Sequence, residues 1–326
     1  MLVLDRRSLL KATAAGAVVA AGNGPADAKA PKDTAAAGEA PGFYRFALGD
    51  YRITLLCDGV FSLPTESIAT NVAADEKKAY FDAHYIASDT FALQINPLVI
   101  DTGQKRILVD TGIGVGKDWA LQAGRLDKAL ESAGIAADTI DTVVLTHCHP
   151  DHIGGIDADP AKQFPNAELV VSETEMGLWN APDAASKVPE WARELVPGIQ
   201  KTFAALGDRM RPVKSGGEIV TGVASIDTAG HTPGHISLLV GSGEKQLLIT
   251  GDAIASIHIS FDQPEWQIIW DHDREKGATT RRALLDRAAN DRLLVAGYHY
   301  PFPGVGHVVK EGQGFRWLPS DWVWEG

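Results

Sequence analysis

The stretch Thr146-His147-Cys148-His149-Pro150-Asp151-His152-Ile153-Gly154-Gly155 contains four side chains of the kinds that bind metal ions. It directly follows the apolar run 142–145, whose composition predicts a buried strand. Imidazole and carboxylate groups are the ligands that zinc and similar divalent cations take in proteins. The stretch therefore predicts a metal site at the end of a strand.

The spacing within this stretch divides its ligands between two ions. His147 and His149 are two residues apart, so in extended or turn backbone their side chains project to the same side. Asp151 and His152 follow the bend expected at Pro150, and we expect them to face a second ion.

Three later segments also place a ligand-type residue after an apolar run. The run 223–227 leads to His231, the run 246–250 leads to Asp252, and the run 293–296 leads to His299. Each of these residues alone would more often be an ordinary buried polar group. Because open α/β sheets gather ligands at the carboxyl ends of their strands, the three together are predicted to complete the two sites.

From residue 43 onward, short β-type runs alternate with helical stretches, which predicts one α/β domain over residues 43–326. The expected strands cover residues 51–57, 93–101, 106–110, 142–145, 168–171, 223–227, 236–240, 246–250 and 292–296. A turn sequence at residues 101–104 predicts that residues 93–110 form a hairpin. Helical segments are expected over residues 118–132, 173–207 and 274–289, the second being an insertion divided by prolines.

The N-terminus resembles a twin-arginine export signal. Arg6 and Arg7 precede a small apolar stretch, residues 12–21, and cleavage is expected after Ala28 or Ala30. We therefore expect a signal peptide over residues 1–30, a disordered Pro/Ala/Gly-rich spacer over residues 31–42, and a periplasmic or secreted product. The apolar stretch is shorter than the ~20 residues of a membrane span. The alternative is a basic start to an ordinary domain.

The charge argues against one class of partner, and the cysteine content argues against a disulfide framework. The formal net charge is -12, and no Lys/Arg cluster reverses it locally, so nucleic acid is not an expected partner. The two cysteines, Cys57 and Cys148, are too few for a disulfide framework. Cys148 alternates away from its histidine neighbours and is expected to be buried in the core rather than to bind metal.

Taken together, these motifs resemble the metallo-β-lactamase superfamily: HxHxDH at 147–152, His231 in GHTPGH, Asp252 in TGD, and a last histidine at 299. The resemblance extends from about residue 43 to residue 326 and implies an αββα sandwich of two mixed β-sheets flanked by helices. The segment 299–307, HYPFPGVGH, and the export-type N-terminus are similar to the methyl parathion hydrolase group and its quorum-quenching, lactone-hydrolysing relatives.

The resemblance also implies a role for each residue. One ion is expected on His147, His149 and His231, the other on Asp151, His152 and His299, with Asp252 between them. Asp110, in the segment VDTG, is expected to support the ligands without binding metal, and His235 likewise. His84, His258, His272 and His307 belong to no motif and are expected to be surface or structural histidines.

Two divalent ions, zinc by default with manganese, cobalt or iron also suited, are expected to share a hydroxide that attacks the substrate. Asp151 and Asp252 would accept the proton of this hydroxide or donate a proton to the leaving group. Tyr298 and Tyr300 flank His299, and a phenol there is expected either to stabilise the oxyanion or simply to pack.

The substrates expected from this resemblance are small neutral esters: lactones, aryl esters and organophosphate triesters. A β-lactamase is the first alternative, although true zinc β-lactamases lack the bridging aspartate. A glyoxalase II-like thioesterase and a catalytically silent metal-binding module stay open. Trp179, Phe261 and Trp266 are expected to form an apolar wall for the substrate or else to lie in the core. The aromatic-rich C-terminal quarter and the subgroup resemblance predict a homodimer.

Overall fold

The computed structural model describes residues 42–120, 122–157 and 162–323. The first strand in the described residues is β1 (Phe43–Leu48). The expected export signal over residues 1–30, and the expected spacer over residues 31–42 apart from Gly42, lie outside the described residues. Among the described helices, none has both the length and the apolar character needed to cross a bilayer.

The first sheet has seven strands in the order β1-β2-β5-β6-β7-β8-β9. Its pairs are antiparallel from β1 to β6 and parallel from β6 to β9. After β1 the strands are β2 (Tyr51–Leu56), β5 (Leu98–Asp101), β6 (Arg106–Val109), β7 (Thr142–Val144), β8 (Glu168–Ser172) and β9 (Met210–Val213).

The second sheet also has seven strands, in sequence order from β10 to β16. All of its pairs are antiparallel except β13–β14, which is parallel. The strands are β10 (Glu218–Val220), β11 (Val223–Asp227), β12 (Ile236–Ser242), β13 (Lys245–Ile249), β14 (Leu294–Ala296), β15 (Val305–Glu311) and β16 (Gly314–Pro319).

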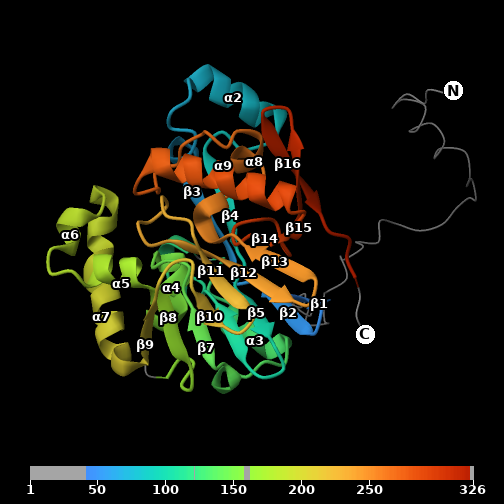
Figure 1. Ribbon diagram of the computed structural model, residues 1–326. Coiled ribbons are helices and arrows are strands. Elements are labelled where there is room, and N and C mark those ends of the chain that lie inside the picture. Colours follow the sequence, from blue (N-terminus) through green and yellow to red (C-terminus); the bar gives the residue numbers. More distant parts are fainter. Residues whose placement is uncertain (1–41, 121, 158–161, 324–326) are drawn as a thin grey trace, which may run out of the picture. The chain divides into compact units, whose positions relative to one another are not determined.

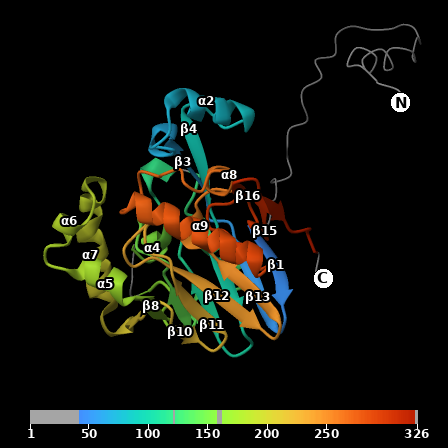
Figure 2. The same ribbon diagram turned by 45° about the horizontal axis from the view of Figure 1, so that its top comes forward.

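The two sheets pack face to face, and helices cover their outer faces. Ile53 and Ile107 of the first sheet share one buried core with Leu238 and Leu247 of the second. On the first sheet's outer face lie α3 (Leu126–Ser132), α5 (Glu173–Asn180) and α7 (Val196–Leu206); α9 (Arg274–Asn290) covers the second. Figures 1 and 2 show α9 across one side and α5 with α7 beside β8. This arrangement confirms the expected αββα sandwich.

A separate two-stranded sheet, β3 (Gly59–Pro64) with β4 (Thr90–Ile95), corrects part of the expected hairpin. The predicted strand 93–101 is in fact two strands, β4 and β5, which lie in different sheets. The chain breaks at Asn96-Pro97, where Pro97 has no N–H and the N–H of Asn96 donates to the Tyr298 carbonyl. The hairpin that does form is β5–β6. Helix α2 (Ala74–Ala83) packs beside β3 and β4 through Phe81.

The predicted helix 118–132 is also wrong in its first half. A short 3-10 turn, η2 (Asp118–Ala120), precedes α3, and Gly124 between them has φ +82°, which ends any continuous helix. The insertion 173–207 is helix-rich as predicted: α5 is followed by α6 (Ala184–Lys187), η4 (Glu190–Leu195) and α7. The remaining short elements are η1 (Thr65–Ser67), η3 (Ala137–Thr139), α4 (Pro150–Asp157), η5 (Gly207–Arg209), η6 (Gly251–Ile254) and α8 (Ile259–Asp262).

Candidate metal centre

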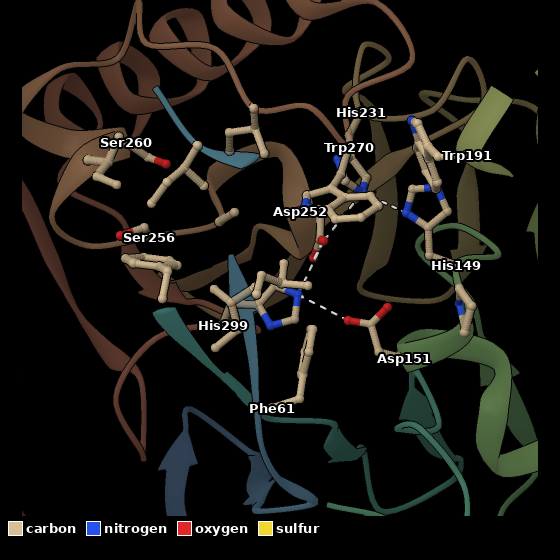
Figure 3. Close-up of a pocket in the computed structure, with 18 of the residues that line it drawn as sticks. Phe61, His149, Asp151, Trp191, His231, Asp252, Ser256, Ser260, Trp270 and His299 are labelled. Carbon is tan, nitrogen blue, oxygen red and sulfur yellow. Dashed lines mark hydrogen bonds and ion pairs between the residues drawn. The ribbon is translucent and has the colours of Figure 1, made fainter. Parts of the chain in front are cut away.

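Each of the four ligand stretches follows the carboxyl end of a strand, and the fold brings all four together. The HxHxDH stretch follows β7 and runs into α4, while His231 lies in the loop after β11. Asp252 lies in η6 directly after β13, and His299 follows β14. Figure 3 shows Asp151, His231, Asp252 and His299 converging from these separate elements.

The seven predicted ligands form three overlapping groups in which the ligand atoms all lie within 4.8 Å of one another. The groups are His147, His149 and His231; His147, His152 and Asp252; and Asp151, His152 and His299. The first and third are the two ligand sets that the sequence predicts, and the second connects them. The geometry therefore brings together His and Asp clusters that could hold metal ions.

Asp252 lies between the two sets. Its Oδ2 is 3.3 Å from His231 Nε2 and 3.2 Å from His299 Nε2, and its Oδ1 is 3.2 Å from His152 Nε2. Burial opposes its charge, but His299, His152 and His231 together hold the pKa of Asp252 well below its usual range. The Oδ2 of this carboxylate therefore lies between a histidine of each ligand set, while its Oδ1 faces the second set alone.

The buried polar atoms fit divalent cations. Nε2 of His147 and of His152 and Oδ1 of Asp252 are buried without a hydrogen bond, although buried polar groups normally have one. His149 Nδ1 points at His231 Nε2, 2.9 Å away, and a cation between them would satisfy both nitrogens. Burial, followed by the neighbouring histidines, holds the pKa values of His147 and His149 well below the usual range. Their neutral rings are the form that binds metal.

Asp110 and His235, predicted to support the ligands, both contact candidate ligand residues. Asp110 Oδ2 lies 2.8 Å from His152 Nδ1, and Asp110 Oδ1 accepts from the N–H of Thr146 at 2.8 Å. His235 Nε2 accepts from the N–H of Asp252 at 3.0 Å, and burial lowers the pKa of His235 to about 3. A neutral His235 can therefore serve as this acceptor.

Two further positioning groups carry no motif and were missed. Asp271 Oδ1 lies 2.8 Å from His231 Nδ1, and Asp271 Oδ2 pairs with the buried Arg281 at 3.2 Å. The carbonyl of Gln94 on β4 lies 2.6 Å from His299 Nδ1. Both partners are distant in sequence from the histidines they orient, so nothing in the local pattern identifies them.

The predicted catalytic role of Tyr298 needs correction. Its hydroxyl donates to the backbone carbonyl of Asp151 at 2.6 Å, and its buried ring stacks on His152 with centroids 4.0 Å apart. A hydroxyl committed to that carbonyl supports the position of Asp151 rather than an oxyanion. Tyr300 is fully buried against Phe261 and Trp317 and belongs to the core.

An apolar pocket of about 250 Å³ opens onto the ligands. His149, Asp151, His231, Asp252 and His299 form its metal side. Its walls come mainly from β3, β4, η4 and the segment before α9: Phe61, Leu63, Phe91, Leu93, Trp119, Trp191, Leu195, Ile259, Ile268 and Trp270. Ser256 and Ser260 add hydroxyl groups away from the metal side (Figure 3).

None of the three predicted substrate-binding aromatics lines this pocket. Trp179 is fully buried and donates from Nε1 to Glu175 Oε1 at 2.7 Å. Phe261 is a buried residue of α8, and Trp266 packs on Tyr80. Aromatic content alone does not separate a pocket wall from a core, because both bury apolar rings.

Among the histidines without a motif, His84 and His307 have polar partners, whereas neither ring nitrogen of His272 has a hydrogen bond. His84 Nε2 pairs with Asp262 at 3.2 Å, and His307 Nδ1 lies 2.9 Å from the Leu293 carbonyl. The ring of His272 lies 5.6 Å from that of His149, and His258 lies 6.3 Å from His84. Cys148 is buried, as expected.

Two curated proteins similar to this chain are described as probable metallo-hydrolases, Rv2300c of Mycobacterium tuberculosis and Mb2322c of Mycobacterium bovis. Each is 30% identical over 214 residues, covering 56% of this chain and 65% of the relative. The chain thus spans just under two thirds of their length. An N-acyl homoserine lactonase of Bacillus sp. is 26% identical over 236 residues, covering 69% of this chain and 81% of that protein.

Two solved structures resemble this one along nearly their whole length. AidC, a dizinc quorum-quenching lactonase in complex with a product, N-hexanoyl-L-homoserine, has a TM-score of 0.80 and 29% identity, covering 86% of this chain and 98% of that one. The hydrolase AbOPH has a TM-score of 0.79 and 29% identity, covering 87% and 99%.

The family model described as the Metallo-beta-lactamase superfamily matches residues 90–299, which is more than half of the chain. That span includes every strand end from which a predicted ligand projects. The chain therefore belongs to the metallo-β-lactamase superfamily.

Proposed function

We propose that this chain is a metal-dependent hydrolase of small neutral esters and that its main substrates are lactones with an apolar acyl tail. The proposal rests on one observation. The ligand set borders a pocket whose remaining walls are almost entirely apolar. The lactonases among its structural neighbours support the same substrate class.

When bound, two divalent cations, zinc by default, would polarise the ester carbonyl and lower the pKa of a shared water. His147, His149 and His231 would hold one ion, and Asp151, His152 and His299 the other. Asp252 would contact both, since its carboxylate lies beside His231 of the first set and beside His152 and His299 of the second. Asp151 and Asp252 both line the pocket, so either carboxylate is placed to accept a proton from the attacking water and return it to the leaving oxygen.

The pocket selects for uncharged substrates. Among the described residues that line it, none is a lysine or arginine. The carboxylates of glutathione or of a β-lactam antibiotic would find no lysine or arginine in this lining, which disfavours the thioesterase and β-lactamase alternatives. An aliphatic acyl chain would instead bury apolar surface against Phe61, Ile259 and Ile268.

A neutral phosphotriester is the second candidate substrate. It also presents one polar oxygen to the ligand set and carries apolar arms. Trp191 and Trp270, whose ring centroids lie 5.1 Å apart, border the pocket beside His149 and His231. Asp151 and Asp252 would transfer protons in the same way as for a lactone.

The experiment is a substrate panel on the purified, metal-loaded chain. We expect a hexanoyl-substituted lactone to be cleaved with a higher kcat/KM than paraoxon-type triesters and aryl esters, and a carbapenem to be cleaved slowest. Removal of metal by a chelator should abolish all of these activities, and zinc should restore them. A carbapenem cleaved faster than every lactone would reject the proposal.

We also propose that the chain is exported and forms a homodimer. Support for export is the twin-arginine pattern around Arg6 and Arg7. Support for pairing is limited to exposed apolar groups such as Trp322, which is 63% exposed. N-terminal sequencing of protein from the periplasm should begin after Ala28 or Ala30, and light scattering should give twice the chain mass.

A further inference from the structure

Glu175 is a carboxylate buried beside the metal centre, and no motif marks it. It lies in the first turn of α5, within the helical insertion, and has no solvent exposure. Its Oε1 accepts from the N–H of Cys148 at 3.1 Å and from Trp179 Nε1 at 2.7 Å. Its Oε2 accepts from Thr232 Oγ1 at 2.7 Å and from the N–H of Gly234 at 3.2 Å.

Three of these four donors belong to the loops that carry one complete ligand set. Cys148 stands between His147 and His149, and Thr232 directly follows His231. One carboxylate therefore ties together the two backbone segments from which all three ligands of the first ion project. The segments are more than eighty positions apart in the chain, so tertiary contacts set their spacing; besides Glu175, the N–H of Ile236 donates to the Thr146 carbonyl.

The junction between β8 and α5 also packs closely against the loop that carries His231. Ser172 caps α5 by accepting from the N–H of Glu175 at 3.0 Å, and its hydroxyl donates to the Gly234 carbonyl at 2.6 Å. A Cβ on Gly234 would lie 2.2 Å from the Glu175 nitrogen, so only glycine permits this approach.

The buried carboxylate of Glu175 needs its hydrogen bonds to compensate for the loss of solvation. Burial raises the pKa of the Glu175 carboxyl, while the four hydrogen-bond donors oppose that shift. An isolated buried carboxylate is costly, and it is retained only where hydrogen bonds compensate its desolvation. Here all four compensating donors come from the ligand loops and from α5.

The second ligand set is held by different groups. Asp110 orients His152, Tyr298 supports the Asp151 backbone, and the Gln94 carbonyl orients His299. None of these contacts involves Glu175. The direct contacts of Glu175 are thus confined to the loops of the first set, although the two sets also meet at Asp252 and at Thr146, whose hydroxyl lies 3.1 Å from His147 Nδ1 and 3.4 Å from His152 Nδ1.

We propose that Glu175 is a positioning residue that sets the metal affinity of the His147–His149–His231 set and leaves the Asp151–His152–His299 set unaffected. The inference rests on the two-ion site of the proposed function, but not on its substrate. It also makes the helical insertion a support for the metal centre.

The test compares Glu175→Gln with Glu173→Gln, which changes an exposed acid on the same helix turn. The amide introduced by Glu175→Gln keeps the side-chain shape but turns one acceptor into a donor that faces other donors. Zinc binding to the metal-free chains is measured by chelator competition. We expect one ion to bind with unchanged affinity in Glu175→Gln and the other about 10- to 100-fold more weakly. Glu173→Gln should match the wild type.

Two results would overturn the inference: unchanged affinity for both ions in Glu175→Gln, or equal weakening of both. If Glu175→Gln does not fold, as judged by circular dichroism of the metal-free chain, Thr232→Val takes its place. That variant removes one donor, and we expect the same one-site loss at smaller size; unchanged binding would again overturn the inference. Because no substrate is used, a wild-type chain that binds two ions but cleaves no ester contradicts only the proposed function.

Discussion

The metal centre and the apolar wall of the pocket face the same cavity, but the chain encodes them in different ways. All seven ligands lie in short motifs at strand ends and are recognisable by residue type. The wall is assembled from β3, β4, η4 and the segment before α9, and its residues resemble those of any core. The difference shows that a site defined by chemical identity can be read from sequence more readily than one defined by shape.

The strongest test of this contrast removes the residue between the two ligand sets. Asp252→Ala takes away the carboxylate whose oxygens face His231, His299 and His152. We expect loss of at least one bound ion and a fall in kcat/KM of at least about 10²-fold. Metal analysis together with ester hydrolysis measures both. A variant with full metal content and full activity would show that Asp252 does not bridge the sites.

A smaller effect is expected from a positioning residue that the sequence did not reveal. Asp271→Asn weakens the contact with His231 and leaves Arg281 buried without its ionic partner. We expect about 3 kcal/mol of lost stability and at least about 10-fold weaker metal binding. Thermal unfolding and chelator competition measure these.

The exposed pair Arg282–Glu265 provides the control for Asp271, because its side chains are 38% and 60% exposed. Glu265→Gln should change stability by less than about 1 kcal/mol and should not change metal binding. Equal effects of the two variants would mean that Asp271 has no special role.

Substitution of two aromatic residues distinguishes the pocket wall from the core. Trp191→Ala opens the pocket beside His149, so we expect KM for an acyl lactone to rise about 10-fold with little change in stability. Phe261→Ala leaves a cavity under α8, so we expect about 3 kcal/mol of lost stability and an unchanged ratio of aryl to alkyl substrates. The reverse pattern would place Phe261 in the substrate site after all.

The smallest expected effect concerns Tyr298. Tyr298→Phe removes one hydrogen bond to the Asp151 carbonyl, which should cost about 1 kcal/mol of stability and less than about 10-fold in kcat. Loss of a true oxyanion donor would cost about 10²- to 10³-fold in kcat. Steady-state kinetics thus decide between the position found in the structure and the role expected from the sequence.

Several features of this protein were determined by sequence alone. The α/β class and the strand ends that carry the ligands follow from local patterns, while the αββα arrangement and the grouping of His147, His149 and His231 follow from the resemblance to the family. Such features are predictable because ligand type and apolar periodicity are properties of neighbouring residues.

Only the tertiary structure decided how those ligands are held and what surrounds them. Asp271 contacts His231 and Gln94 contacts His299, although each pair is far apart in the sequence. At Pro97, the segment predicted to be one strand divides into two strands that lie in different sheets. Trp179 is as aromatic as Trp191, yet one is in the core and the other lines the pocket. Contacts of this kind depend on which distant surfaces meet when the sheets pack, and no local pattern records that.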